Sequence, residues 1–224
     1  MQTTLERKNE RRFHVTDYLE LATRFSNELE SITGLRWQIK DFPDLRNEIE
    51  ETQDTFRVHL PAYDYLVYLR QHGFPSPLLD WTESPYIAAY FAFYENLSRE
   101  RVSVFAYIET PNRVKSGMGG APKIKLMGKY VTTTKRHFAQ KSWYTIATEW
   151  TGEPKRHTFC EHSRVFDKGS KKQYVLFKIT IPASDRLEAL SDLEDSNLNH
   201  FTLFQSEDSL IKTMEIRGFD LDSD

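Results

Sequence analysis

The 224-residue chain has one cysteine, Cys160, and it lacks any run of about 18 apolar residues. A single cysteine excludes an intramolecular disulfide, and the missing apolar run excludes a predicted membrane-spanning helix. The polar start, MQTTLERKNERR, also lacks the apolar core of a signal peptide. We therefore expect a cytoplasmic protein that has no membrane partner.

Acidic residues are missing from a long central stretch, Thr110 to Thr148, whereas the end of the chain is strongly acidic. The central stretch carries eight basic residues: Arg113, Lys115, Lys123, Lys125, Lys129, Lys135, Arg136 and Lys141. From Ala183 onward, eleven acidic residues stand against three basic ones. This asymmetry predicts that the basic segment 113–141 meets a nucleic acid or an acidic protein surface. The alternative is that the basic middle and the acidic end neutralise each other within one fold.

The pattern of apolar residues predicts an α+β fold. Hydrophobic residues make up 39% of the chain, which is enough for a core, and the length favours one domain over 1–224. Apolar spacing predicts helices over 16–34, with Thr16 as N-cap and Gly34 as the stop, and over 44–53, 55–71, 183–195 and 206–218. Strands are predicted over 101–110, 142–150 and 171–182, and flexible segments over 1–15 and 112–123. We expect a helical N-terminal half packed on a small mixed or antiparallel sheet.

A polar corner precedes a strongly apolar helix in QHGFPSPLLDWTESPYIAAYFAF, residues 71–93. Ser84 and Pro85 fit the N-cap and the first helical position. The preceding residues, Asp80, Trp81, Thr82 and Glu83, have two interpretations. They shape and cap the helix start, or they form a ligand site in which the helix N-terminus receives an anion and Trp81 receives a ring.

A second polar-aromatic segment, KRHFAQKSWYTIATEW, spans residues 135–150. A cation, an imidazole, an amide and hydroxyls gather around a transition from loop to strand. This mixture suits a ligand that carries both phosphate and a heterocycle, such as a nucleotide. The alternative is a half-buried strand with a solvated outer face.

Other site patterns are absent or incomplete. His157-x-x-Cys160-x-His162 lacks a second compact ligand group, so we expect no metal. SGMGG is not followed by the lysine-hydroxyl pair of a phosphate-binding loop, and the sequence has no G-x-S-x-G elbow. The sequence gives Cys160 no partner that would identify it as a nucleophile.

Three blocks of the chain resemble the FRG domain family. LRQHGFPSPLLDWTESPYIAAYFAF resembles its central signature, and RHFAQKSWYT and FTLFQSEDSLIKTM resemble two later blocks in the same order, so that the resemblance covers roughly residues 60–215. Two departures stand out. Ser76-Pro77 replaces the threonine-arginine pair of the family, and no aromatic-Arg-Gly tripeptide precedes Tyr18. A missing N-terminal segment or a partner chain would have to supply that element.

The resemblance implies a layout similar to that of ADP-ribosyltransferases, with NAD as the substrate whose nicotinamide bond is broken. Carried onto this chain, it implies catalytic roles for Asp80, Glu83 and Gln140, with Glu149 as the alternative carboxylate. The implied cofactor-binding residues are Trp81, Thr82, Arg136, Ser142, Tyr144 and Thr145. In this scheme Arg136 contacts the diphosphate, aromatic rings pack the heterocycles, and hydroxyl and amide groups orient the ribose.

Members of the family resemble toxin-like and phage-defence-linked bacterial proteins. The first hypothesis is therefore an NAD-consuming transferase that acts on nucleic acid or protein. The second is a non-catalytic module that binds nucleic acid or protein through the basic segment. A third treats the domain as a structural fragment that needs a partner chain.

Overall fold

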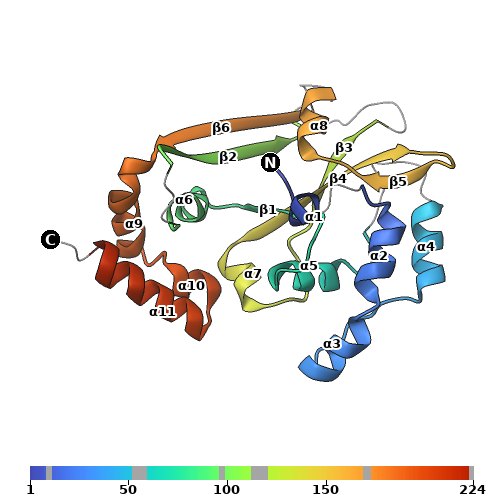
Figure 1. Ribbon diagram of the computed structural model, residues 1–224, viewed down its shortest axis with the longest axis horizontal. Helices are drawn as coiled ribbons and strands as arrows, with labels where there is room; N and C mark the ends of the chain where they lie inside the picture. The colour runs from blue at the N-terminus through green and yellow to red at the C-terminus, as the bar shows by residue number, and fades with distance from the viewer. Residues whose placement is uncertain (9–11, 52–59, 96–98, 112–120, 169–172, 222–224) are drawn as a thin grey trace. The chain divides into compact units, whose positions relative to one another are not determined.

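The computed structural model describes residues 1–8, 12–51, 60–95, 99–111, 121–168 and 173–221 (Figure 1). Its internal contacts group into two compact units. Unit 1 comprises Met1–Leu79, Ile108–Thr133 and Tyr144–Val175, and unit 2 comprises Asp80–Tyr107, Thr134–Trp143 and Leu176–Asp224. A single domain over 1–224 stays a prediction, and each unit is described by itself below.

The helix predicted over 16–34 is two helices in unit 1. The break falls between α2, Val15–Thr23, and α3, Ser26–Thr33. The predicted stop is confirmed, because Gly34 takes the left-handed conformation (φ 71°) and its N–H donates to the Glu30 carbonyl. The predicted N-cap is wrong: Thr16 lies inside α2, and its hydroxyl accepts a 2.5 Å hydrogen bond from Arg156 instead.

The next two predicted helices are confirmed with shifted bounds. α4 spans Phe42–Glu50, and α5 spans Tyr63–Gln71. Pro61 precedes α5 and lies outside the helix. Residues 52–59 lie outside the described part of the chain. Unit 1 also contains two short helices that the sequence pattern did not predict, α1 (Thr4–Lys8) and α8 (His162–Lys168).

Small sheets complete the α+β fold, which is confirmed. One sheet has the order β1-β4-β3, with β5 also paired to β4, and the other pairs β2 with β6. The strands are β1 (Leu79–Thr82), β2 (Arg101–Glu109), β3 (Lys123–Met127), β4 (Ser142–Thr151), β5 (Arg156–Phe159) and β6 (Tyr174–Pro182). β2, β4 and the described part of the third predicted strand are confirmed. The antiparallel pair β3–β4 sets Ile124 opposite Ala147, and both are buried.

The flexible segment predicted over 112–123 ends earlier than expected. Lys123 opens β3 and is 4% exposed, which contradicts a loop at that position. Residues 112–120 of that segment lie outside the described residues. The short strands β1 and β5 were also missed, because four-residue strands carry too few alternations to show a period.

The core of unit 1 joins the N-terminal helices to β4. Its largest fully buried side chains include Tyr18 of α2, Tyr65 of α5 and Tyr144 of β4. Tyr18 packs edge-on against Phe159 at a ring-centroid distance of 5.7 Å, which ties α2 to the end of β5. Burial of each such aromatic side chain contributes about 1.5–3 kcal/mol.

Unit 2 is built mainly from helices. They are α6 (Pro85–Phe93), α7 (Lys135–Ala139), the 3₁₀ helix η1 (Ala183–Asp185), α9 (Arg186–Asp195), α10 (His200–Phe204), α11 (Glu207–Glu215) and the π-helix η2 (Ile216–Leu221). The helices predicted over 183–195 and 206–218 are confirmed. Ser84 caps α6 as predicted, because its hydroxyl accepts from the Ile87 N–H. The core of the unit includes Ile87, Tyr90, Leu190 and Leu203.

None of the helices in the described ranges combines the length and the apolar composition that crossing a bilayer requires.

Candidate functional site

The residues predicted to form the site fall into both units. Tyr144 and Thr145 lie in unit 1. The others lie in unit 2: Asp80, Trp81, Thr82, Glu83, Arg136, Gln140 and Ser142. Their catalytic and cofactor-binding roles stay predictions. The hydrogen bonds and ring contacts that their side chains make within each unit are described below.

Within unit 2 the two sequence blocks meet in direct contact. The Thr82 hydroxyl donates to the Gln140 carbonyl at 2.8 Å, and the Glu83 N–H donates to the Lys141 carbonyl at 3.2 Å. The indole N–H of Trp143 donates to the Glu83 carboxylate at 2.8 Å. These bonds join β1 and its following turn to the loop before β4 and to the first residues of β4, so they stabilise the architecture of unit 2 directly.

The remaining residues of the unit-2 group are also engaged with neighbours. The buried Gln140 donates from its amide to the Leu203 carbonyl at 3.2 Å. Arg136 places its guanidinium 4.2 Å from the centre of the Phe204 ring, a cation–π contact. The Trp81 ring lies 5.3 Å from that of Tyr107. Asp80 is exposed and Ser142 is buried.

Tyr144 and Thr145 are fully buried in unit 1. The Tyr144 hydroxyl accepts a 2.8 Å hydrogen bond from the Gln71 amide. The Thr145 hydroxyl lies 2.9 Å from Nε2 of His162, whose pKa is lowered by burial to about 4. His162 is therefore neutral at physiological pH, and its Nε2 can accept a hydrogen bond from the Thr145 hydroxyl.

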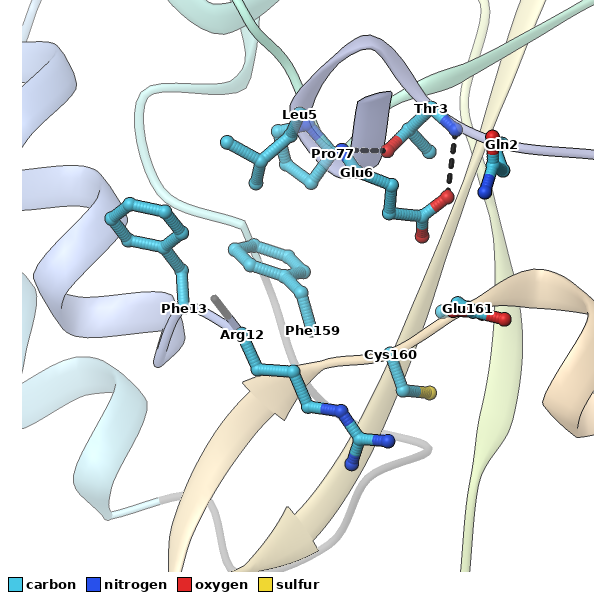
Figure 2. Close-up of a pocket in the computed structure, with 11 residues that line it drawn as sticks. Gln2, Thr3, Leu5, Glu6, Arg12, Phe13, Pro77, Phe159, Cys160 and Glu161 are labelled. Atoms are coloured by element: carbon cyan, nitrogen blue, oxygen red, sulfur yellow. Dashed lines mark hydrogen bonds between the residues drawn. The ribbon is translucent and has the colours of Figure 1, made fainter. Parts of the chain in front are cut away.

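A cavity in unit 1 offers space that these predicted residues do not line (Figure 2). Its volume is about 270 Å³, just below the roughly 300–1,000 Å³ typical of pockets for drug-sized ligands. A ligand the size of one ring and a sugar fits that volume better than a whole dinucleotide does. The lining residues are Gln2, Thr3, Leu5, Glu6, Arg12, Phe13, Pro77, Ala147, Phe159, Cys160 and Glu161.

One wall of this cavity comes from the start of the chain, which the sequence had suggested to be flexible. A capping box opens α1: the Thr3 N–H donates to the Glu6 carboxylate at 2.8 Å, and the Glu6 N–H donates to the Thr3 hydroxyl at 3.2 Å (Figure 2). The Leu5 N–H donates to the Ser76 carbonyl, and the Ser76 N–H donates to the Thr4 hydroxyl. Residues 3–8 are thus fixed against the loop before β1. Partial burial raises the pKa of Glu6.

An ion triad centred on the buried Glu149 supports another part of the wall. Arg12 and Arg164 donate to the same Glu149 oxygen at 2.8 and 2.9 Å. The Glu149 side chain is 6% exposed, whereas that of Arg12 is 56% exposed and lines the cavity. Glu149, the alternative carboxylate of the sequence hypothesis, therefore holds Arg12 in place with one of its oxygens.

The thiol in the cavity wall stays protonated at neutral pH. Cys160 is 4% exposed, and burial raises the pKa of its thiol to about 12, with the nearby Glu149 carboxylate adding to the effect. Because the thiolate is the nucleophilic form, Cys160 serves as an apolar wall residue. The next residue, Glu161, is exposed and faces the same cavity.

The cavity therefore combines one cation, two carboxylates and aromatic walls. Arg12 can bind an anionic group, Glu6 and Glu161 can face a positive centre, and Phe13 and Phe159 supply apolar surface. Of these residues, only the Thr3-x-x-Glu6 spacing carried a readable signal, the capping box. Within the described residues, no group of three His, Cys, Asp or Glu side chains could hold a metal ion.

The basic segment is less exposed than its charge suggested. Lys135 and Lys141 are exposed, whereas Lys123 is buried and Arg136 stacks on Phe204. Arg113 and Lys115 lie outside the described residues. Whether the segment binds nucleic acid or protein stays a prediction.

Comparison with known proteins supports the family resemblance. Residues 1–101 match the model of the FRG domain, so the recognition made from the sequence motifs is confirmed. The match begins at residue 1, upstream of the blocks that suggested it, and ends before the RHFAQKSWYT and FTLFQSEDSLIKTM blocks. A search of curated proteins and a search of solved structures each found no match.

Proposed function

We propose, from the premise that this is an FRG domain-containing protein, that it is an NAD-consuming enzyme of the ADP-ribosyltransferase type. The unit-1 cavity would bind the nicotinamide-ribose end of NAD. The observation that carries the proposal is the joint presence of Arg12, Glu6, Glu161 and two aromatic walls around one cavity. Most of the lining residues come from within the range that matches the FRG model.

The residues suit the chemistry of the nicotinamide bond. When the bond between C1′ of the ribose and the ring nitrogen breaks, nicotinamide leaves with the bonding electron pair, and positive charge develops on the ribose. A carboxylate near C1′ stabilises that charge, and a group held in place before the reaction does so at the lowest cost in reorganisation. Each carboxylate already accepts a hydrogen bond, Glu6 from the Thr3 N–H and Glu161 from the Ser163 hydroxyl. Glu161 is the better candidate because it is exposed, whereas partial burial raises the pKa of Glu6 and disfavours its charged form.

Arg12 would take the phosphate next to the ribose. Its guanidinium is held by the buried Glu149, and its side chain, which is 56% exposed, lines the cavity. Guanidinium groups bind phosphate oxygens through charge-assisted hydrogen bonds, which are stronger than neutral ones. The acceptor nucleophile, on a nucleic acid or a protein, would then bond to C1′ and release its proton to solvent.

The test is release of nicotinamide from NAD by the purified chain, followed by chromatography with and without candidate acceptors. We expect release by the wild-type chain and a loss of about 100-fold or more in Glu161→Gln, as is typical when a transition-state electrostatic partner is removed. Glu20→Gln, which changes an exposed carboxylate of α2, is the matched control and should keep full activity. No release under any acceptor condition, or equal release by both variants, would contradict the proposal.

A second candidate function is a non-catalytic module that binds nucleic acid or protein. The observation that favours it is that Thr82, Gln140 and Thr145, three of the residues implied to bind or act on NAD, are engaged in hydrogen bonds within their own units. Binding to DNA or RNA through phosphates weakens steeply with salt. A salt titration of binding, repeated with Lys135→Gln and Lys141→Gln, separates this module from the enzyme.

The cellular setting is part of the same proposal. A cytoplasmic toxin or phage-defence protein that consumes NAD would lower the NAD content of the cell that expresses it. Expression of the wild-type chain should slow growth, and expression of Glu161→Gln should not.

A further inference from the structure

α11 is oriented with polar side chains inward and apolar side chains outward. Ser209 and Thr213 on its inner face are 3% and 2% exposed. Leu210, Ile211 and Met214 on its outer face are 41%, 65% and 60% exposed. A surface helix normally shows the reverse arrangement, with its apolar stripe toward the core.

Hydrogen bonds to α10 and within α11 fix this orientation. The Thr213 hydroxyl accepts from the Phe201 N–H of α10 at 2.8 Å and donates to the Ser209 carbonyl at 2.9 Å. Ser206 and Ser209 form a capping box at the start of the helix. Figure 1 shows α10 and α11 side by side at the C-terminal end of the chain. The inner polar face is therefore satisfied, and rotation of α11 would break these bonds.

The outer apolar residues form one stripe. Positions 210, 211 and 214 share a helix face, since residues three and four apart are neighbours on a helix; we call Leu210, Ile211 and Met214 the α11 stripe. Phe219 of the following π-helix is 79% exposed and Phe201 of α10 is 42% exposed, which adds apolar surface within the same unit. Contiguous apolar surface of this kind marks an interaction site more often than scattered single residues do.

Acidic side chains lie beside the α11 stripe on the same helix. Glu207, Asp208 and Glu215 are exposed on the same helix, whereas Lys212 is paired with Glu215 at 2.8 Å. The segment from Ala183 to the end of the chain carries eleven acidic and three basic residues. A second copy of this acidic segment, or an anionic membrane, would be repelled. Complementary charge instead requires a basic partner.

We propose that the α11 stripe docks an amphipathic helical segment of a partner protein, with apolar residues on one face and lysine or arginine on its flanks. The apolar face of that segment covers Leu210, Ile211 and Met214, and its cations meet Glu207 and Asp208. This mode, a helix laid against an apolar surface, is common in peptide recognition. It is independent of the proposed NAD chemistry, which lies in unit 1.

The test uses a fluorescently labelled synthetic helical peptide of leucine and lysine, with its leucine-glutamate counterpart as the charge control. We expect the full chain to bind the lysine peptide by fluorescence anisotropy and not the glutamate peptide. The double variant Ile211→Gln/Met214→Gln should weaken binding about tenfold or more. Ile32→Gln, which removes a 76% exposed isoleucine from α3, should bind like the wild type.

Four outcomes would overturn the proposal. Equal binding of the two peptides would show that charge does not select the partner. Unchanged binding by the double variant would show that the α11 stripe is not the binding surface. If light scattering shows that the wild type is a dimer and the double variant is a monomer, the α11 stripe binds a second copy of the chain instead. If the wild type co-sediments with phosphatidylcholine vesicles and the double variant does not, the α11 stripe binds a membrane instead.

Discussion

At the scale of single residues, Glu149 is the carboxylate whose removal should cost unit 1 the most. It is nearly buried and accepts hydrogen bonds from Arg12 and Arg164 on one oxygen. Glu149→Gln keeps the shape but removes the charge, so we expect a loss of about 1–3 kcal/mol of unfolding free energy. Urea denaturation measures it. Glu20→Gln, on the exposed face of α2, should change stability by less than about 0.5 kcal/mol, and equal losses in the two variants would show that the triad contributes nothing.

The same scale shows what the sequence could and could not predict about the site. The family resemblance implied that the LLDWTESP and RHFAQKSWYT blocks contribute to one site, and Thr82 does contact Gln140 within unit 2. The sequence could not predict that the Thr82 hydroxyl donates its hydrogen bond to the Gln140 carbonyl, because the partner of a donor depends on the fold. The cavity was missed for a related reason: Arg12 and Glu161 meet there only after folding.

At the scale of elements, the backbone conformation of Gly34 at the end of α3 predicts the effect of an alanine substitution on stability. It has φ +71°, a conformation that side chains disfavour, although a Cβ would meet no atom within 4 Å. Gly34→Ala should therefore destabilise the chain by about 1–2 kcal/mol through backbone strain alone. Gly128 also has open space but no positive φ, so Gly128→Ala should be neutral or stabilising by up to about 1 kcal/mol. Thermal unfolding of both variants checks this, and a matching loss in both would attribute the effect to something other than φ.

Helix and strand predictions succeeded where local signals were strong. Ser84-Pro85 starts α6 and Gly34 ends α3, since both act through the residues beside them. The break between α2 and α3 at Arg24 and Phe25 was missed, because no glycine or proline marks it. Long-range contacts also pin α1, whose Leu5 N–H bonds to the Ser76 carbonyl. A five-residue helix gains its stability from such contacts rather than from its own sequence.

At the scale of the whole molecule, stability should depend on pH through buried histidine. Burial lowers the pKa of His162 to about 4, and burial with nearby Lys212 and Arg136 lowers that of His200. In the unfolded chain His162 has a pKa of about 6.5, so between about pH 4 and 6.5 it is mostly protonated there, whereas it stays mostly neutral in the folded protein. Stability therefore rises with pH between about 4 and 6.5 and falls as the solution is acidified through that window. Glu6, whose pKa is raised by burial, acts in the opposite direction.

Comparison with His162→Gln separates the contribution of His162 to the pH dependence of stability from the contributions of Glu6 and the other carboxylates. Glutamine stays neutral at every pH, and its amide can form a hydrogen bond with the Thr145 hydroxyl, whose oxygen lies 2.9 Å from Nε2 of His162 in the wild type. We expect the wild type to lose as much as about 3 kcal/mol more than the variant between pH 7 and pH 4, because each pKa unit corresponds to about 1.4 kcal/mol. Urea denaturation at half-unit pH steps measures both curves. Parallel curves over this range would show that His162 titrates normally, and a wider gap at high pH would reverse the sign of the argument.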